Sequence, residues 1–295
     1  MLARVRAYFA DNDVLAVDTP SLSPFAPTDR HIDSLSLKES ELFLHTSPEF
    51  HMKRLLAAGY PDIYSICRVY RGGEKGRTHL PEFTMIEWYR HSMTLDEIEK
   101  DTLHLIASVL DRPDLLGSVM RHEYADVFVN GLGLDPAAAP LDELASAAGA
   151  DASLRDAIAG DRDAWLDLIM ATRIATTFRD DTLTVVQHYP ASQAALARIC
   201  PDNSMVADRF EIYFGTLELA NGYVELTDAE EQIRRMNNDL DARRERKRPD
   251  VPRDELLIEA LRSGLPDCAG VALGFERLHM IDAAADDIRN VVSFT

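Results

Sequence analysis

Two stretches of the first hundred residues alternate between apolar and polar positions. The run IYSICRVYR (63–71) and the run EFTMIEWYR (82–90) are separated by a polar loop that contains three glycines. Side chains of a strand point to opposite faces with a period of two, and a polar, glycine-bearing loop between two such runs is typical of a hairpin. The pattern therefore predicts a long antiparallel hairpin over residues 63–90.

Helix signals lie on both sides of this hairpin. In TSPEFHMKRLLAAG, Ser47 is a candidate N-cap, with a proline after it for the first helical position, and Gly59 is a candidate helix stop. Thr94 and Glu97 form a capping box that begins an amphipathic helix. Residues 1–20 are expected to form a short helix followed by an extended segment.

The rest of the chain combines helical and strand patterns. Residues 112–180 are rich in alanine and acidic residues and are expected to form a helical insertion. Strand patterns follow in LTVVQHY, RFEIYF and LELANGYVEL, then a polar helix over 228–248, and finally a glycine-marked strand that runs into a helix in GVALGFERLHMI. Mostly antiparallel strands with helices around them indicate an α+β fold. We find no repeat or linker that divides the chain, so one domain over residues 1–295 is expected.

Composition restricts the class of protein. The chain has 295 residues, of which 46% are hydrophobic and 27% charged, as in folded globular proteins. No apolar run approaches the roughly 20 residues that span a bilayer, and the first residues lack the apolar core of a signal peptide. Cys67, Cys200 and Cys268 lie far apart without a CxxC spacing, so neither a disulfide framework nor a zinc site is indicated. A soluble cytoplasmic protein is expected.

The charge of the chain also restricts its partners. The formal net charge is -19, whereas proteins that hold long nucleic acids usually present a basic face to the phosphates. Outside the loop between the two strands, the dense basic run is ARRERKRP (242–249), which is typical of a solvated helix end. Extended tRNA binding is therefore not expected.

Against this acidic background, the loop between the two strands is basic. Arg71 lies at its start, and Arg77 and His79 lie at its end. Such side chains can clamp a polyphosphate, with glycine amides as further donors. Arg277, just after the glycines of GVALGFER, is a second candidate clamp, although the chain has no P-loop motif. The pattern predicts a triphosphate ligand.

One carboxylate in the second strand needs an explanation. The period of two places Glu87 on the same face as Phe83, Met85 and Tyr89. If that face packs in the core, Glu87 is a buried carboxylate that requires a partner. A ligand cation and a structural arginine are both possible partners.

A second carboxylate pair occurs in FEIYFGTLELANGY. Glu211 and Glu218 lie directly opposite each other if Phe214 and Gly215 form the turn, and they are diagonal neighbours if Gly215 and Thr216 form it. Like charges across a strand pair are destabilising, and a divalent cation such as Mg²⁺ between them would reverse that effect. Two solvated glutamates on an edge hairpin are the alternative. Carboxylates for Mg²⁺ and arginines for phosphate together suggest ATP.

These stretches resemble the motifs of class II aminoacyl-tRNA synthetases. YRGGEKGRTHLPEFTMIEWY resembles motif 2, GVALGFER resembles motif 3, and the DTP that ends at Pro20 resembles motif 1, which forms the dimer interface in that class. Within the class, TSPEFHMKRLL, PEFTMIEWY and RFEIYFGTLELANGYVELTDA are similar to lysyl-tRNA synthetases. The resemblance covers nearly the whole chain and is weakest in the alanine-rich insertion.

One difference points to a branch of the class. Lysyl-tRNA synthetases carry an anticodon-binding barrel before motif 1, whereas motif 1 begins almost at residue 1 here. With HYPASQAALA and PDCAGVALG, the chain resembles the elongation factor P lysine ligase family. The resemblance implies ATP-dependent activation of lysine or (R)-β-lysine with Mg²⁺, transfer to a lysine side chain of elongation factor P, and a homodimer. A truncated synthetase that charges a tRNA or another acceptor, and a catalytically silent regulatory paralogue, are the alternatives.

The resemblance also implies roles for individual residues. Arg71 and Arg277 would be catalytic, and Glu211 and Glu218 would hold Mg²⁺. The implied ATP-binding residues are Arg71, Glu74, Arg77, His79, Phe83, Glu211, Glu218 and Arg277. The implied residues of the amino acid pocket are Ser47, Glu49, Glu87, Tyr89, Asn221, Tyr223, Glu225, Ala272 and Gly274.

Within that pocket, the two ends of a diammonium substrate are treated differently. By the resemblance, Glu49 would bind one ammonium group, while Glu87, Tyr89 and Glu225 would bind the other, and Asn221 would contact the carboxylate. This assignment explains why three glutamates, whose burial would otherwise be costly, are present in the pocket.

The chain departs from the synthetase pattern at a few of these positions. Gly73 stands where lysyl-tRNA synthetases have Glu in motif 2, and Glu74 follows one place late. Leu80 replaces Asn, and Tyr223 replaces Phe. Ala272 stands where those enzymes have Gly, and its extra methyl group favours a substrate other than ordinary α-lysine.

Overall fold

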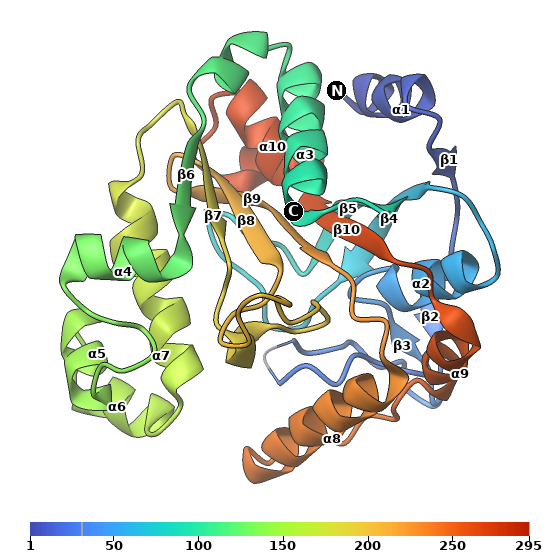
Figure 1. The fold of residues 1–295 in the computed structure, drawn as a ribbon. Helices are drawn as coiled ribbons and strands as arrows, with labels where there is room; N and C mark the ends of the chain where they lie inside the picture. Colours follow the sequence, from blue (N-terminus) through green and yellow to red (C-terminus); the bar gives the residue numbers. More distant parts are fainter. Residues whose placement is uncertain (31, 295) are drawn as a thin grey trace. The chain divides into compact units, whose positions relative to one another are not determined.

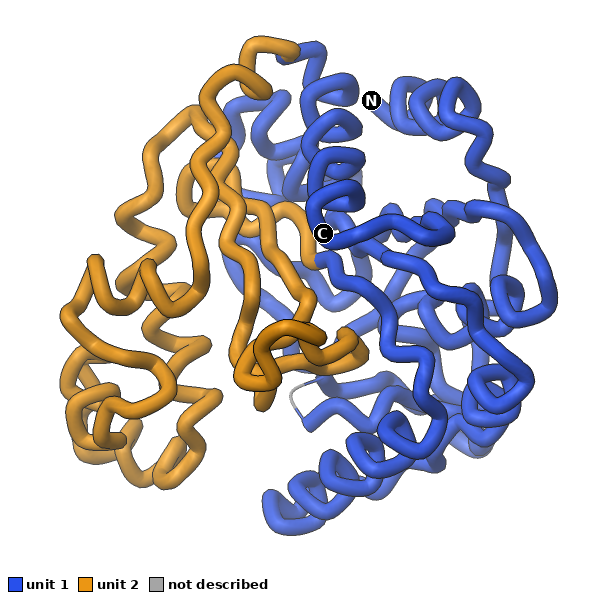
Figure 2. Tube along the Cα trace, viewed as in Figure 1, with its two compact units in different colours: residues 1–112, 222–295 blue, residues 113–221 orange. Residues whose placement is uncertain are grey.

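The computed structural model describes residues 1–30 and 32–294 and contains two compact units (Figure 2). Unit 1 consists of Met1–Arg112 and Gly222–Thr295, and unit 2 consists of Pro113–Asn221. Within the described part of the chain, no helix is both long and apolar enough to cross a membrane. The expectation of one domain with a helical insertion stays a prediction.

Unit 1 contains a sheet with helices packed on it (Figure 1). Its strands in hydrogen-bonded order are β1 (Leu15–Ala16), β4 (Ile63–Tyr70), β5 (Glu82–His91) and β10 (Cys268–Gly274). Its helices are α1 (Leu2–Asp11), α2 (Glu49–Ala57), α3 (Leu95–Leu110), α8 (Ala229–Glu245), α9 (Glu255–Gly264), α10 (Phe275–Asp282) and the short η5 (Ile288–Asn290). A separate antiparallel pair joins β2 (Leu22–Ser23) and β3 (Phe43–Leu44). The β4–β5 and β5–β10 pairs are antiparallel, and β1–β4 is parallel.

The predicted hairpin is confirmed as β4 and β5, and its two faces pack against different helices. On one face, Tyr89 belongs to a buried cluster with Met52 of α2 and Leu257 of α9. On the other face, Trp88 is fully buried and its ring centroid lies 5.5 Å from that of Phe9 in α1. Successive side chains of β5 thus pack into apolar clusters on opposite faces of the sheet. The strand is therefore buried on both sides, although its sequence alternates.

Local signals place the helix ends of unit 1. The backbone N–H of Glu49 donates to Ser47 Oγ at 2.9 Å, although α2 begins at Glu49, one residue later than the sequence predicts. Gly59 ends this helix region with a φ of 89°, a conformation that favours glycine. The capping box of Thr94 and Glu97 is confirmed at the start of α3.

The basic run at the end of α8 is not simply a solvated helix end, as the sequence suggested. Arg243 is only 3% exposed, and its guanidinium donates to the carbonyl oxygens of Asp29, Ile32 and Pro249. Backbone carbonyls therefore satisfy this buried cation, while its neighbour Arg244 is exposed. One of the basic side chains is structural.

Unit 2 combines short helices with the remaining strands. Its helices are α4 (Tyr124–Leu132), α5 (Leu141–Ala147), α6 (Ala152–Ile158), α7 (Arg162–Ile169) and the short η1 (Pro113–Gly117), η2 (Met170–Ile174), η3 (Ala175–Thr177) and η4 (Ala191–Gln193). Its strands are β6 (Met120–Glu123), β7 (Leu183–Gln187) and β8 (Arg209–Phe214), while β9 (Leu217–Val224) begins in unit 2 and ends in unit 1. The β6–β7 pair is parallel and β7–β8 antiparallel.

The helices of residues 112–180 are confirmed, and they bury a core of their own around Phe128, Leu144 and Trp165. The apolar faces of these short helices supply that core. Packing stabilises the helices, because none of them is long enough to be stable alone. Antiparallel pairs predominate over parallel ones in the two units, with helices packed beside them. The α+β class expected from the sequence is confirmed.

Candidate active site

A buried lysine lies between two glutamates in unit 1. Lys53 Nζ lies 2.6 Å from Glu49 Oε1 and 2.5 Å from Glu225 Oε2. Glu49 and Lys53 are one turn apart on α2, and Glu225 directly follows β9, where its N–H donates to the carbonyl of Cys268. Helix α2 and the end of β9 thus bring the three charges together.

The third glutamate of this cluster, Glu87, is 2% exposed and is held by hydroxyl groups. Its Oε2 accepts from Ser47 Oγ at 2.7 Å, and its Oε1 accepts from the hydroxyl of Tyr89 at 2.8 Å. Tyr223 donates to Glu49 Oε1 at 2.8 Å. The bonds to Glu87 within residues 1–30 and 32–294 come from hydroxyls, so they do not support a structural arginine as its partner.

The electrostatics of this cluster leave negative charge in excess once its carboxylates are ionised. Burial, together with the charge of Glu49, raises the pKa of Glu87 to about 8. Burial also raises the pKa of Glu225 to about 8, against the opposing effect of Lys53. For Lys53, burial would lower the pKa, but the carboxylates of Glu225 and Glu49 more than offset it and raise the pKa overall. Three carboxylates share one ammonium group, so a ligand cation would stabilise the ionised cluster.

One oxygen of the cluster is still available to a ligand. Glu225 Oε1 is buried and has no hydrogen-bond partner within the described residues. The other oxygen, Glu225 Oε2, forms an ion pair with Lys53 Nζ at 2.5 Å. A buried carboxylate oxygen without a donor is costly unless a donor arrives with a ligand.

Strand β10 forms the neighbouring wall of this cluster. Ala272 pairs with Glu87, Gly274 with Met85, and Gly270 with Tyr89. A Cβ atom on Gly270 would lie 2.4 Å from Glu225 Oε1 and 2.5 Å from Cε1 of Tyr89. Only a residue without a side chain fits there.

Lys53 and Gly270 are therefore part of the site although the sequence analysis did not select them. A signal for Lys53 exists, because Glu and Lys four residues apart on a helix form a pair. The spacing of Gly270 carries no such signal, because the atoms it makes room for come from β5 and from the end of β9.

Motif 2 brings a cation and an aromatic ring together. Arg71 follows β4, and its guanidinium lies 5.3 Å from the centroid of the Phe83 ring. Its Nε donates to the carbonyl of Thr46 at 3.3 Å, and Glu74 lies 3.6 Å away as an ion-pair partner. The carbonyl of Thr46 and the ring of Phe83 both orient the Arg71 guanidinium. An oriented guanidinium can bind a phosphate or carboxylate group in a defined position.

Motif 3 places a second arginine beside the same loop. Arg277 of α10 donates to Nε2 of His79 at 2.6 Å and to the carbonyl of Thr78 at 3.3 Å. Because a guanidinium only donates, Nε2 of His79 accepts, and Nδ1 carries the proton toward Thr78 Oγ1. Burial and the charge of Arg277 lower the pKa of His79, so the imidazole is neutral near pH 7.

The base of α10 is anchored to β5 by a buried glutamate. Glu276 is 5% exposed and accepts from the backbone N–H and the hydroxyl of Thr84, each at 2.8 Å. This contact ties the first turn of α10 to β5, and Arg277 is the next residue of that turn. Another motif 2 cation, Arg77, is mostly exposed and donates to the carbonyl of Asp286 at 3.1 Å.

Unit 2 contains its own carboxylate site, around Glu211 of β8. Glu211 Oε2 accepts from the hydroxyls of Tyr189 at 2.6 Å and Tyr213 at 2.5 Å, and Oε1 accepts from Arg209 at 2.6 Å. Strand β8 ends at Phe214 and β9 begins at Leu217, so the turn is Gly215–Thr216. Of the two alternatives left open by the sequence, Glu211 and Glu218 are diagonal neighbours.

The charges in this second site are also unbalanced. Burial and the nearby Glu218 raise the pKa of Glu211, while Arg209 opposes the shift. Burial likewise raises the pKa of Asp167 to about 7. Arg209 also donates to Asn221 Oδ1 at 3.2 Å, so the predicted residue Asn221 lies in this network. Carboxylate oxygens that repel each other are the ligands Mg²⁺ prefers, so Glu211 and Glu218 fit the predicted metal.

The predicted site residues therefore form two groups within the chain. The arginines of motifs 2 and 3 and the predicted residues of the amino acid pocket other than Asn221 belong to unit 1. Glu211, Glu218 and Asn221 belong to unit 2. Arg209, Tyr189 and Tyr213 were not predicted. The two tyrosines lie in apolar strand-like runs, where a tyrosine is normally interpreted as a residue of the hydrophobic core.

Comparison with known proteins agrees with these motifs. The family model for class II tRNA synthetases (D, K and N) matches residues 1–295. An elongation factor P–(R)-β-lysine ligase from Vibrio atlanticus (strain LGP32) is 42% identical over 309 residues, covering 100% of this chain and 93% of the relative. Ligases of the same name from Histophilus somni (strain 2336) and Salmonella typhi are each 40% identical, covering 100% of this chain and 92% of the relative.

Proposed function

The chain belongs to the class II tRNA synthetases of the D, K and N group and, within them, to the family of the elongation factor P–(R)-β-lysine ligases, and we propose that it is such a ligase. It activates lysine or (R)-β-lysine with ATP and transfers the aminoacyl group to a lysine side chain of elongation factor P. The observation that carries the substrate class is the buried cluster of three glutamates around Lys53.

Charge matching supports a substrate with two ammonium groups. Glu49, Glu87 and Glu225 carry three negative charges when ionised, and Lys53 carries one positive charge, so two negative charges are in excess. Lysine and β-lysine each carry two ammonium groups. The two ammonium groups of either substrate neutralise the buried cluster, whereas an amino acid with an apolar side chain leaves one of the negative charges uncompensated.

The first reaction step forms the aminoacyl-adenylate. The substrate carboxylate attacks the α-phosphorus of ATP, the bond to the bridging oxygen breaks, and pyrophosphate leaves. We assign Arg71 to the α-phosphate and substrate carboxylate, and Arg277 to adenine and phosphate, while Phe83 stacks on adenine. These groups position the reactants and stabilise developing negative charge, and no side-chain nucleophile is needed.

The second step transfers the acyl group. The neutral amine of a lysine of elongation factor P attacks the carbonyl carbon of the adenylate, and AMP leaves with the electrons of the broken anhydride bond. The attacking amine loses its proton to solvent or to the departing phosphate.

We also propose Mg²⁺ as the metal held by Glu211 and Glu218, because their repulsion and the raised pKa of Glu211 fit a cation between them. When bound, this ion neutralises charge on the triphosphate. We further propose a homodimer, from the resemblance to motif 1, and a cytoplasmic location, where ATP and elongation factor P are available.

The direct test is the intact mass of elongation factor P after incubation with this protein, ATP and (R)-β-lysine. We expect one β-lysyl increment that requires ATP, and a slower reaction with α-lysine. An unchanged mass with ATP consumed would mean that the acceptor is a different one. If neither a mass change nor amino-acid-dependent pyrophosphate exchange is observed, the proposal is contradicted and a silent paralogue is favoured.

A further inference from the structure

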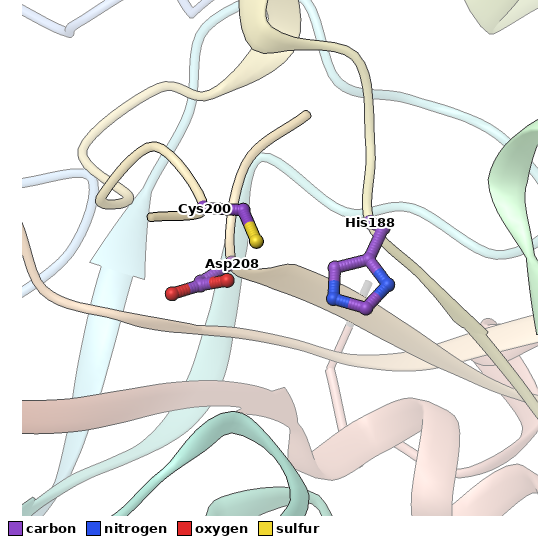
Figure 3. A group of neighbouring side chains, drawn as sticks. All are labelled: His188, Cys200 and Asp208. Atoms are coloured by element: carbon purple, nitrogen blue, oxygen red, sulfur yellow. The ribbon is translucent and has the colours of Figure 1, made fainter. Parts of the chain in front are cut away.

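Three metal-ligand side chains that are distant in sequence meet within unit 2. His188, Cys200 and Asp208 each offer one ligand atom, and these atoms all lie within 4.8 Å of one another. Figure 3 shows the sulfur of Cys200 between the ring of His188 and the carboxylate of Asp208. None of the three belongs to the ATP or amino acid site described above.

The backbone holds these side chains in place. His188 follows β7 and Asp208 precedes β8, and the N–H of His188 donates to the carbonyl of Arg209 at 2.8 Å. Between them the chain forms β-bridges from Pro190 to Val206 and from Ile199 to Ala207. The N–H of Cys200 donates to the carbonyl of Val206 at 2.9 Å. The cluster is thus built on paired backbone rather than on an unpaired loop.

Each of the two flanking ligands uses one polar atom on an outer partner. Nδ1 of His188 lies 2.7 Å from Glu123 Oε2, which leaves Nε2 for a ligand. Arg198 donates through two nitrogens to Oδ2 of Asp208, at 3.0 Å and 2.7 Å, which leaves Oδ1. A carboxylate behind a ligating imidazole and a hydrogen-bond donor behind a ligating carboxylate are the outer contacts that orient metal ligands in proteins.

The identity of the donor atoms selects the kind of metal. A thiolate sulfur, an imidazole nitrogen and one carboxylate oxygen suit Zn²⁺ and other late transition metals, whereas Mg²⁺ prefers oxygen alone. Zinc bond lengths of about 2.0–2.3 Å imply ligand-to-ligand separations of roughly 3.3–3.8 Å in a tetrahedron. The present separations, at most 4.8 Å, need to close by about 1.5 Å at most, within the reach of side-chain rotation. Three protein ligands leave the fourth position for water.

We propose that His188, Cys200 and Asp208 form a Zn²⁺ site that fastens the segment between β7 and β8. Binding displaces the thiol proton of Cys200 to solvent and forms bonds from Zn²⁺ to sulfur, nitrogen and oxygen. The segment carries Gln193, whose carbonyl accepts from Arg209 at 2.7 Å. Metal binding therefore rigidifies the support of Arg209 and, through it, of Glu211. This proposal stands independently of the proposed function.

The test uses Co²⁺ as a spectroscopic probe for the full-length, metal-stripped protein, in buffer that contains excess Mg²⁺. A thiolate bound to Co²⁺ gives a charge-transfer absorption in the near ultraviolet, and tetrahedral coordination gives visible bands. We expect both bands to saturate at one Co²⁺ per chain and to disappear when Zn²⁺ is added. Cys200→Ser should abolish the charge-transfer band, and Cys67→Ser, which removes a different free thiol, should retain it.

Two further variants protect the test from misfolding. His188→Asn keeps a residue that tolerates the positive φ of 57° and should remove the nitrogen ligand. Glu123→Gln leaves all three ligands in place and should weaken Co²⁺ binding about 10- to 100-fold. No saturable thiolate band in the unmodified protein, or an identical titration in Cys200→Ser, would overturn the proposal.

Discussion

Both units bury carboxylates beside a cation, but they resolve the charge imbalance in different ways. In unit 1, Lys53 contacts Glu49 and Glu225, and the hydroxyls of Ser47 and Tyr89 hold Glu87. In unit 2, Arg209 and the phenols of Tyr189 and Tyr213 donate hydrogen bonds to Glu211. The first cluster leaves a buried oxygen of Glu225 without a donor, whereas both oxygens of Glu211 already accept hydrogen bonds.

The difference indicates two kinds of recognition. A compact cluster with an unpartnered oxygen suits ammonium groups, which bring hydrogen-bond donors with their charge. A carboxylate fixed by neutral phenols and one arginine is oriented rigidly, as a metal ligand must be. We therefore expect substitutions in unit 1 to change the response to the amino acid and substitutions in unit 2 to change the response to Mg²⁺.

The largest effect is expected for Glu87→Gln in unit 1. Removing one partner of a buried charge pair costs about 3–5 kcal/mol, so amino-acid-dependent pyrophosphate exchange should fall roughly 150- to 5,000-fold. Glu82→Gln changes the same side chain on the exposed end of the same strand and should change the rate less than about twofold. Full activity of Glu87→Gln with an intact fold would exclude this glutamate from the pocket.

A smaller effect, with a different signature, is expected for Glu211→Gln in unit 2. Losing a hydrogen-bonded charge costs about 2–3 kcal/mol. The rate of amino-acid-dependent pyrophosphate exchange should therefore fall roughly 30- to 150-fold at low Mg²⁺. Raising Mg²⁺ should recover part of the rate, and the amino acid KM should change little. Glu143→Gln, an exposed acid in the same unit, is the control. A Mg²⁺ dependence identical to that of the unmodified enzyme would remove Glu211 from the metal site.

The pH dependence of amino acid binding should show the unit 1 cluster directly. Glu87 and Glu225 have pKa values raised to about 8 by burial, so they are largely protonated at pH 7 without substrate and must ionise to bind ammonium groups. The affinity for lysine or β-lysine should therefore rise with pH, by roughly tenfold between pH 7 and 9 if one proton is released. Isothermal titration in buffers of different ionisation enthalpy measures the proton release. An affinity that is flat over this range would contradict the assigned shifts.

The smallest effect distinguishes two buried phenols of unit 2. Tyr213→Phe removes a donor to Glu211 and should cost about 1–2 kcal/mol, or a thermal midpoint lower by a few degrees. Tyr124→Phe removes a buried hydroxyl that has no hydrogen-bond partner within residues 1–30 and 32–294, so it should be neutral or slightly stabilising. Equal losses for both variants would mean that packing, not the bond to Glu211, sets the cost.

The local structure followed from the sequence because it depends on neighbouring residues. The hairpin of β4 and β5, the capping box at Thr94 and the helices of residues 112–180 all form where patterns of period two or 3.6 predict them. The shared face of Glu87 and Tyr89 is a direct consequence of the pleat. The exact start of α2 shifted by one residue, since Pro48 and Ser47 can both precede a helix.

The sequence by itself thus determined the elements, the motifs and the family to which they belong. Only the tertiary structure placed Lys53 against Glu225, excluded a side chain at Gly270, and gathered His188, Cys200 and Asp208. The physical reason is range. Hydrogen bonds within helices and turns join residues a few positions apart, whereas buried charges and metal ligands depend on distances between strands that the chain connects only through long segments.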